Sequence, residues 1–212
     1  AGLLPVSVAL WVGCLVLMLC RNRDRSAPSV RVVISPLTVV PPREDTHAPR
    51  AIPRVIHQTF KSWDALDADD HRKMDSWRVM NPSWEIRYWT DEACADFVRS
   101  HFPQFFPTFL AFKKPVERAD FFRYLVVYHH GGLYSDTDVL CQRHIEEWLP
   151  QDAELVVGLE NEFSTGAAAG KRSYSRTRQY LQWAFLAAKG HPLLMNMVES
   201  IVAEAGKGSG DE

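Results

Sequence analysis

Residues 118–138 decide the fold, and they read Arg-Ala-Asp-Phe-Phe-Arg-Tyr-Leu-Val-Val-Tyr-His-His-Gly-Gly-Leu-Tyr-Ser-Asp-Thr-Asp. Pro115 opens a helix that this stretch continues to residue 130, and the pair Gly131-Gly132 ends it. Two glycines also let the backbone turn with positive φ and approach a ligand closely. The stretch therefore predicts a helix, a tight turn and a short strand that leads to two carboxylates.

These two carboxylates, Asp136 and Asp138, are the candidate chemical centre. Residues two apart in an extended chain point the same way, so the pair could hold one hard cation such as Mg²⁺ or Mn²⁺. Such a cation would offset the charge that develops on a departing nucleoside diphosphate. The alternative is a turn whose carboxylates cap neighbouring amides. A bare Asp-x-Asp is a weak pattern, because Asp67 and Asp69 form a second one that we interpret as a solvated helix start.

Asp120 and Arg123 are the other charged residues of the stretch. Their spacing of three places both side chains on one face of the helix. They could therefore hold a ligand together, or they could form an ion pair within the helix.

On both sides of this stretch, strands and helices alternate along the chain. We expect strands at 54–57, 84–89, 133–135, 139–141 and 154–159, and helices at 67–80, 91–101, 115–130, 175–189 and 192–205. Such alternation is typical of an α/β sandwich, and the domain begins near Ile52.

Composition limits the class of protein further. The 212 residues carry 24 Lys and Arg against 26 Asp and Glu, a net charge of −2, and 46% are hydrophobic. This balance argues against a disordered chain and against a nucleic-acid-binding protein, which would need a basic face. Four cysteines are too few for a disulfide scaffold, although Cys94 and Cys141 could pair in an oxidising compartment.

The N-terminal part differs from the rest. Residues 1–20 contain no charge and are long enough to span a bilayer as a helix, and a cleaved signal peptide is the alternative. Residues 21–51 contain five prolines and read as an extended stem. The basic cluster Arg21, Arg23 and Arg25 follows the span, and the positive-inside rule would place that side in the cytoplasm. An anchor in that orientation would place the domain that follows in the cytoplasm, which conflicts with the luminal placement that we expect.

Three ordered blocks resemble one known family. Residues 52–60 (Ile-Pro-Arg-Val-Ile-His-Gln-Thr-Phe), residues 81–85 (Asn-Pro-Ser-Trp-Glu) and residues 118–138 look like glycosyltransferase family 32, which has a DxD sugar-binding region. The last block is also similar to the glucosylating domains of large clostridial toxins. Residues 178–183 and 190–193 look most like Golgi initiation-specific α-1,6-mannosyltransferases. The resemblance covers about residues 52–194.

This resemblance implies a GT-A fold, a retaining reaction and a nucleotide-sugar donor, with GDP-mannose expected and Mn²⁺ or Mg²⁺ as the cation. Asp136 and Asp138 would be both the catalytic and the metal-binding residues. The residues expected to bind the nucleotide sugar are Ile56, His57, Gln58, Asp120, Arg123, Gly132 and Tyr134. The residues expected to face the acceptor are Glu160, Trp183 and His191, for each of which a structural role is the alternative. His57 could likewise be a hydrogen-bonded core histidine.

The same resemblance implies a single-pass type II Golgi membrane protein with a luminal catalytic domain. We expect an anchor at 1–20, a stem at 21–51, and at 52–212 a catalytic domain that lacks its C-terminal part. Expected partners are an oligosaccharide or glycoprotein acceptor, the membrane through the N-terminal helix, and other Golgi glycosyltransferases, but not nucleic acid.

Other functions stay open at this point. One is a truncated, non-catalytic, membrane-anchored protein that binds sugar nucleotides. Another is a family member that uses a UDP-sugar or a glycolipid acceptor. A third is a phosphohydrolase of the haloacid dehalogenase type, which would want Thr or Val where this chain has Leu140.

Overall fold

The computed structural model describes residues 51–162 and 178–207, together with the backbone of four short strands nearer the N-terminus. These strands are β1 (Ala9–Leu10), β2 (Leu17–Cys20), β3 (Val30–Val33) and β4 (Thr38–Val39). Apart from them, the anchor expected at 1–20 and the stem expected at 21–51 lie outside the described residues. Within the described part of the chain, no helix has the length and apolar character needed to cross a membrane.

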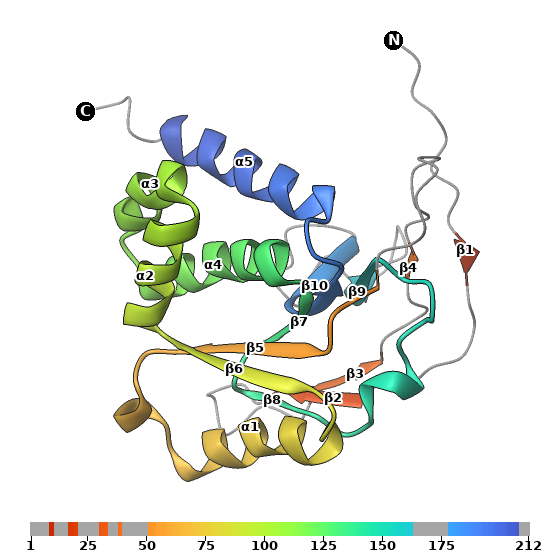
Figure 1. Ribbon diagram of the computed structural model, residues 1–212. Coiled ribbons are helices and arrows are strands. Elements are labelled where there is room, and N and C mark those ends of the chain that lie inside the picture. The colour runs from red at the N-terminus through yellow and green to blue at the C-terminus, as the bar shows by residue number, and fades with distance from the viewer. Residues whose placement is uncertain are drawn as a thin grey trace, which may run out of the picture.

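The centre of the fold is a five-stranded sheet with the order β6-β5-β7-β10-β9 (Figure 1). Its strands are β5 (Val55–Phe60), β6 (Glu85–Thr90), β7 (Gly132–Ser135), β9 (Leu155–Glu162) and β10 (Arg178–Ala187). Strand β5 runs parallel to both β6 and β7, whereas β10 runs antiparallel to β7 and β9. The sheet is therefore mixed, and the expected α/β class is confirmed.

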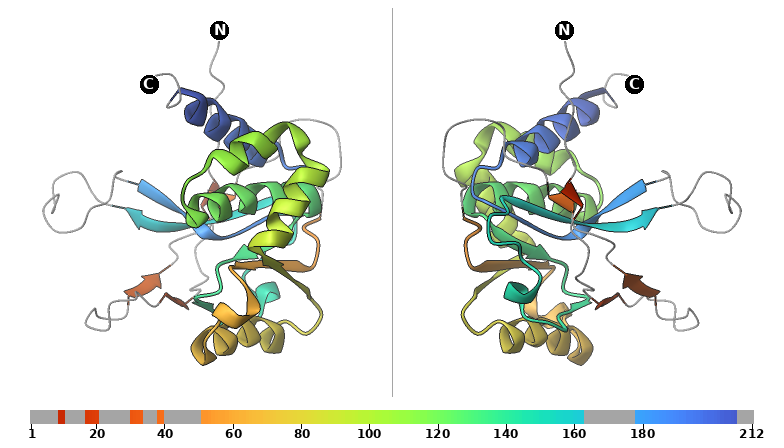
Figure 2. Two further views of the ribbon diagram at one scale, coloured as in Figure 1. Left: turned by 90° about the vertical axis from the view of Figure 1, so that its left-hand side faces the viewer. Right: turned by 90° about the vertical axis from the view of Figure 1, so that its right-hand side faces the viewer.

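Helices cover both faces of the sheet. Helix α1 (Ala68–Met80) lies on one side, and α2 (Asp91–His101), α3 (Phe106–Ala111), α4 (Pro115–His130) and α5 (Pro192–Lys207) lie on the other (Figures 1 and 2). Short 3₁₀ turns are η1 (Trp63–Ala65), η2 (Pro103–Phe105) and η3 (Ile145–Glu147), and the short strand β8 (Val139–Leu140) follows β7. Asp67 caps α1 by accepting the backbone N–H groups of Asp69 and Asp70, which confirms that this Asp-x-Asp is a helix start.

Two hydrophobic clusters fill the layers between helices and sheet. The cluster on the α1 side includes Ile56, Trp77, Trp84, Leu133, Val139 and Leu186. The cluster under α2, α4 and α5 includes Phe97, Phe122, Leu125, Tyr134, Phe185 and Leu194. Cys141 belongs to the first cluster and Cys94 to the second, and both thiols are free. The disulfide considered from the sequence is therefore not formed.

The helix expected at 175–189 is wrong, because the described part of this segment is strand β10. Its residues pair with β7 on one side and with β9 on the other. The four residues from Ala184 to Ala187 are buried, as expected for an interior strand whose two faces are both covered. A short apolar run of this kind cannot be assigned to helix or strand from periodicity alone, and the two neighbouring strands decide it.

Candidate functional site

Strand β7 leads into the candidate site, and its start is fixed by the two glycines. Gly131 has φ of 72° and Gly132 has φ of 95°. A Cβ atom on Gly132 would lie 2.3 Å from the carbonyl oxygen of Val55, so only glycine fits there. The close approach made by Gly132 is thus to β5, and its predicted contact with a donor stays a prediction.

Arg123 is the central cation of the site. Its side chain is only 4% exposed and reaches two carboxylates, Asp120 at 2.6 Å and Asp136 at 3.3 Å. Nη1 also donates to the carbonyl oxygen of Gln182 on β10, at 2.9 Å. The ion pair within the helix is therefore present, and the same guanidinium connects α4 to the end of β7 and to β10.

Tyr134 contacts both Arg123 and Asp136. Its ring lies 4.9 Å from the Arg123 guanidinium carbon, and its hydroxyl donates to Oδ1 of Asp136 at 2.8 Å. Thr59 of β5 lies 2.7 Å from the same hydroxyl and donates to it. Burial raises the pKa of Tyr134 well above its ordinary value, so the hydroxyl remains a donor.

Arg123 and Tyr134 both contact the same carboxylate oxygen of Asp136, Oδ1. Burial raises its pKa to about 6, while Arg123 and the Tyr134 hydroxyl act in the opposite direction. Asp136 is therefore largely ionised at neutral pH. Because Arg123 and Tyr134 both contact Oδ1, the second carboxylate oxygen is the one that remains for a ligand.

Asp138 lies two residues further on and is exposed. Partial burial raises the pKa of its carboxyl group, and the nearby Lys73 opposes that effect. Lys73 is buried at 6% exposure and forms an ion pair with Asp69 at 2.9 Å. It comes from α1, whose Trp77 donates to the carbonyl oxygen of Val139 at 3.0 Å and so fixes this helix beside the residues after β7.

The carboxylates of Asp136 and Asp138 fit a hard divalent cation, which prefers oxygen ligands. Among residues 51–162 and 178–207, no group of three or more His, Cys, Asp or Glu side chains is arranged to hold a metal. A cation at this pair would therefore need further oxygens from a bound diphosphate or from water.

The side chains predicted to face the nucleotide base are all inside the protein. Ile56, His57 and Gln58 have no exposed surface, and Ile56 belongs to the core cluster against α1. His57 donates from Nε2 to the carbonyl oxygen of Gly131 at 3.1 Å, and its Nδ1 accepts the Trp89 indole N–H at 3.2 Å. His57 is thus a hydrogen-bonded core histidine, as the alternative interpretation has it, and burial lowers its pKa to about 3.

Gln58 differs from its two neighbours. Neither its amide nitrogen nor its amide oxygen has a hydrogen-bond partner among the described residues, although both atoms are buried. The structure does not test a contact of these three residues with a nucleotide.

The three predicted acceptor residues lie in different parts of the fold. Trp183 contributes its carbonyl oxygen, which accepts the Asp136 N–H at 2.9 Å, while its side chain packs against the core cluster beside α1. His191 is buried, and its Nδ1 accepts the N–H of Leu193 at 3.3 Å where α5 begins. Glu160 lies in β9. A contact of these residues with an acceptor stays a prediction.

Sequence reasoning missed Thr59, Lys73 and the backbone of Gln182 as parts of this site. Thr59 directly follows the His57-Gln58 pair in β5, and Lys73 lies one helical turn before Trp77. Neither position carries a motif, and both become neighbours of the carboxylates only through contacts across the sheet.

Known proteins share this region. Residues 67–155 match the family described as a glycosyltransferase sugar-binding region containing a DXD motif. An initiation-specific alpha-1,6-mannosyltransferase of Schizosaccharomyces pombe is 34% identical over 166 residues, which are 74% of this chain and 41% of the relative. A mannosyl phosphorylinositol ceramide synthase of Saccharomyces cerevisiae is 37% identical over 109 residues, which are 50% of this chain and 28% of the relative. The chain thus spans less than half the length of these two relatives.

A solved structure shares the fold. The PaToxG glycosyltransferase has a TM-score of 0.54 with 16% identity, over 77% of this chain and 65% of its own chain. The family match contains α1, β6, α4, β7 and both carboxylates, and it confirms the resemblance that the three sequence blocks indicated. Residues 67–155 therefore belong to the family of glycosyltransferase sugar-binding regions that contain a DXD motif.

Proposed function

We propose that this chain is the N-terminal and central part of a retaining GT-A glycosyltransferase that moves mannose from GDP-mannose onto a glycan in the Golgi lumen. The observation that carries this proposal is the arrangement at the end of β7. There an ionised Asp136, held by Arg123 and Tyr134, lies two residues from an exposed Asp138. This provides two carboxylates close together, with Asp136 fixed in orientation before any ligand binds.

Each of the surrounding side chains has a distinct role in this proposal. Asp136 and Asp138 hold Mn²⁺ or Mg²⁺, and the cation supplies charge stabilisation to the diphosphate leaving group. Arg123 is shielded from solvent and acts through Asp136, so we assign it a positioning role. Asp120 is 36% exposed beside Arg123, and its carboxylate is available to accept hydrogen bonds from sugar hydroxyls.

The choice of mannose rests on the relatives, because both that are named above are described as enzymes that transfer mannosyl groups. The Golgi location, the anchor at 1–20, the stem at 21–51 and the oligosaccharide or glycoprotein acceptor follow from the resemblance described first. They belong to the proposal for the same reason.

Donor binding tests the proposal directly. The full chain in detergent is titrated by calorimetry with GDP-mannose, UDP-glucose and UDP-galactose, with and without Mn²⁺. We expect Mn²⁺-dependent binding of GDP-mannose that is lost in Asp138→Ala and kept in Asp96→Ala, an exposed residue of α2. Binding of a UDP-sugar alone would replace the donor, and the absence of any donor binding by the folded protein would favour a non-catalytic remnant.

A second acceptor class is favoured by one specific observation. The relative from Saccharomyces cerevisiae, at 37% identity, is described as a mannosyl phosphorylinositol ceramide synthase. Transfer of radiolabelled mannose is therefore compared between an α-mannoside oligosaccharide and inositol phosphoceramide. Labelling of the lipid alone would move the proposal to a glycolipid acceptor with the same donor site.

A further inference from the structure

The connection between α2 and α4 is the most apolar exposed stretch in the described part of the domain. Residues 103–116 read Pro-Gln-Phe-Phe-Pro-Thr-Phe-Leu-Ala-Phe-Lys-Lys-Pro-Val and contain no acidic residue. We call this stretch, which includes η2 and α3, the apolar edge. Leu110 is 51% exposed and Val116 is 59% exposed, whereas Phe105, Phe106 and Phe112 are partly buried. Adjoining apolar surface of this kind marks an interaction site more often than scattered single residues do.

The apolar edge is held firmly in its outward position. Phe109 is 2% exposed and lies in the core cluster beneath α2 and α4. Arg118 donates from Nε to the carbonyl oxygen of Phe112 at 3.1 Å and from Nη2 to that of Leu110 at 3.3 Å. One inward anchor and one cation that binds two carbonyl groups therefore present Leu110 and its neighbours to solvent in a fixed arrangement.

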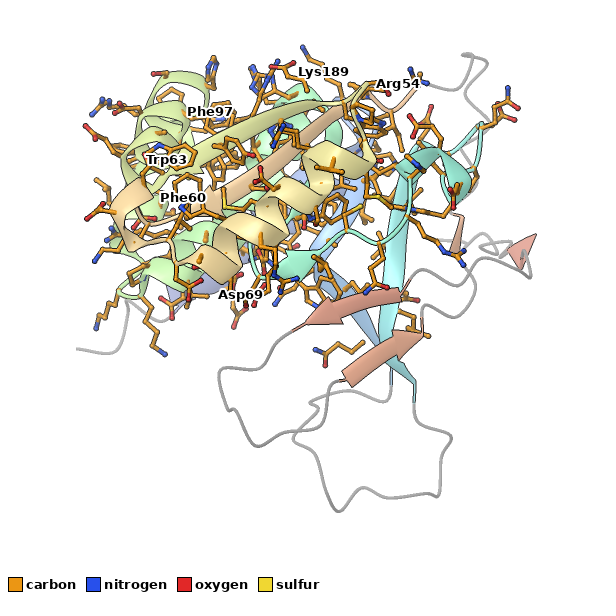
Figure 3. The ribbon with its side chains drawn as sticks, turned by 90° about the horizontal axis from the view of Figure 1, so that it is seen from below. Arg54, Phe60, Trp63, Asp69, Phe97 and Lys189 are labelled. Atoms are coloured by element: carbon orange, nitrogen blue, oxygen red, sulfur yellow. The ribbon has the colours of Figure 1, made fainter. Side chains whose placement is uncertain are left out.

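The apolar edge leads directly into α4, and Arg118, which anchors it, is two residues before Asp120. An exposed aromatic residue, Trp63 at 54% exposure, lies in η1 after β5 and packs on Phe60 with ring centroids 4.7 Å apart (Figure 3). The N–H of Asp91 donates to the carbonyl oxygen of Lys61 at 3.3 Å, which ties the start of α2 to the segment before Trp63. The left panel of Figure 2 views the molecule from the side on which these elements lie.

Cations accompany the apolar side chains. Lys113 and Lys114 are both exposed, and Lys114 lies 4.0 Å from Glu117. The guanidinium carbon of Arg99 lies 6.0 Å from the ring centre of Phe106. Aromatic and aliphatic side chains with lysines beside them are the combination that enters the headgroup region of an anionic bilayer. A neutral protein partner would not need the lysines, and a nucleic acid would not need the apolar groups.

We propose that the apolar edge docks on an anionic lipid surface, and this inference rests on the proposed function in its form with an inositol phosphoceramide acceptor, whose phosphates would supply the negative charge. Leu110, Phe112 and Val116 would enter the interface, and Lys113 and Lys114 would contact lipid phosphates. A lipid-linked acceptor would then lie in the same membrane surface on which the domain docks. This contact is separate from any anchor in the N-terminal segment, and its test needs no transfer activity.

Hydrogen exchange on the full chain tests the proposal. The protein is reconstituted in nanodiscs of pure phosphatidylcholine and in nanodiscs that contain 30% phosphatidylserine, and amide exchange is followed by mass spectrometry. We expect the amides of residues 104–114 to exchange several-fold more slowly on the anionic discs, while the outer face of α1 stays unchanged. Because the basic cluster Arg21, Arg23 and Arg25 also responds to anionic lipid, substitutions confined to the apolar edge are needed to separate the two contributions.

Two exposed pairs give matched variants. Lys113→Glu/Lys114→Glu should remove the protection, since each lysine near an anionic surface contributes about fivefold to binding. Arg72→Glu/Arg78→Glu makes the same charge change on α1, where both side chains are more than 60% exposed, and should keep it. Leu110→Ser/Val116→Ser should weaken protection without unfolding, because both positions are at the surface.

Three results would overturn the proposal. One is equal exchange on both discs, and another is protection that survives the Lys113→Glu/Lys114→Glu change. The third is protection already present without lipid that grows with protein concentration, which would assign the apolar edge to contact between copies of the chain.

Discussion

The middle and the last turn of helix α4 both carry buried or half-buried polar side chains, but they use them in opposite ways. In the middle, Arg123 joins two carboxylates and a tyrosine, and the exposed Asp138 lies beside them. At its last turn, His130 stacks on His57 with ring centroids 5.7 Å apart, and its Nδ1 accepts an N–H of Arg87 at 3.1 Å. The middle of the helix holds opposite charges, whereas the last turn holds neutral rings that bond to Gly131, Trp89 and Arg87.

This difference in charge distinguishes a candidate ligand-binding site from a part of the core. Burial lowers the pKa of His57 to about 3 and that of His130 to about 4, so both rings are neutral at physiological pH. A neutral, hydrogen-bonded ring is stable without a ligand, whereas two neighbouring carboxylates gain from a bound cation. Four predictions test this contrast, in order of expected effect.

The largest effect is expected from Arg123→Met. Removing a buried cation leaves Asp120 and Asp136 without their partner, and breaking such a pair costs about 3–5 kcal/mol of folding free energy. Urea unfolding measures the loss, and Arg78→Met, at a 64% exposed position, should change stability by less than about 0.5 kcal/mol. A loss below about 1 kcal/mol in Arg123→Met would show that solvent already screens the pair.

Asp138→Asn should separate binding from stability. The raised pKa of Asp138 means that the fold disfavours its charge, so the variant should be as stable as the parent or more stable. Removing one of two cation ligands should nevertheless weaken Mn²⁺-dependent donor binding by about 100-fold. Calorimetry and thermal unfolding on the same samples measure both quantities, and Asp96→Asn is the control. Unchanged donor affinity would remove Asp138 from the site.

Tyr134→Phe should have an intermediate effect. The variant keeps the ring over Arg123 but leaves Thr59 and Asp136 without the hydroxyl, which should cost about 2 kcal/mol. Tyr180→Phe, at 47% exposure, should be neutral in the same denaturant titration. If Tyr134→Phe is equally neutral, the tyrosine does not hold Asp136 in place.

The smallest effect, counted per pH unit, concerns the histidines at the last turn of α4 and appears as a pH slope. His57 takes up a proton in the unfolded chain below pH 6.5 but not in the fold until about pH 3, so stability is present above pH 6.5 and falls as pH decreases between these values. The contribution is about 1.4 kcal/mol per pH unit. His57→Gln should flatten the slope, and His71→Gln on the exposed face of α1 should not. Because His130 behaves in the same sense, part of the slope should remain. An unaltered slope in His57→Gln would contradict the assignment.

Much of this architecture could be predicted from local patterns. Helix ends are examples, because they depend only on residues close in sequence: a proline begins α4, a glycine pair ends it, and an aspartate caps α1. Strand β10 could not be predicted, because its neighbours β7 and β9 precede it in the chain and only pairing with them makes the segment extended. The carboxylate pair stood out as a pattern, but the partners that hold Asp136 did not. Thr59 and Gln182 lie on other strands, and sequence spacing does not indicate a contact between residues so far apart.

Strand β7 contains only four residues, and Gly132 at its start is fixed against the carbonyl group of Val55. The distance from that contact to the first carboxylate is therefore set by residue count, and no loop can absorb a change. A single inserted or deleted residue in this strand would exchange the faces on which Tyr134 and Ser135 lie, and would carry the aspartates away from Arg123. Length variation among natural relatives should accordingly be absent between the glycine pair and Asp138 and frequent in the connections around the rim, so that this segment can be transplanted into another chain only as an undivided unit.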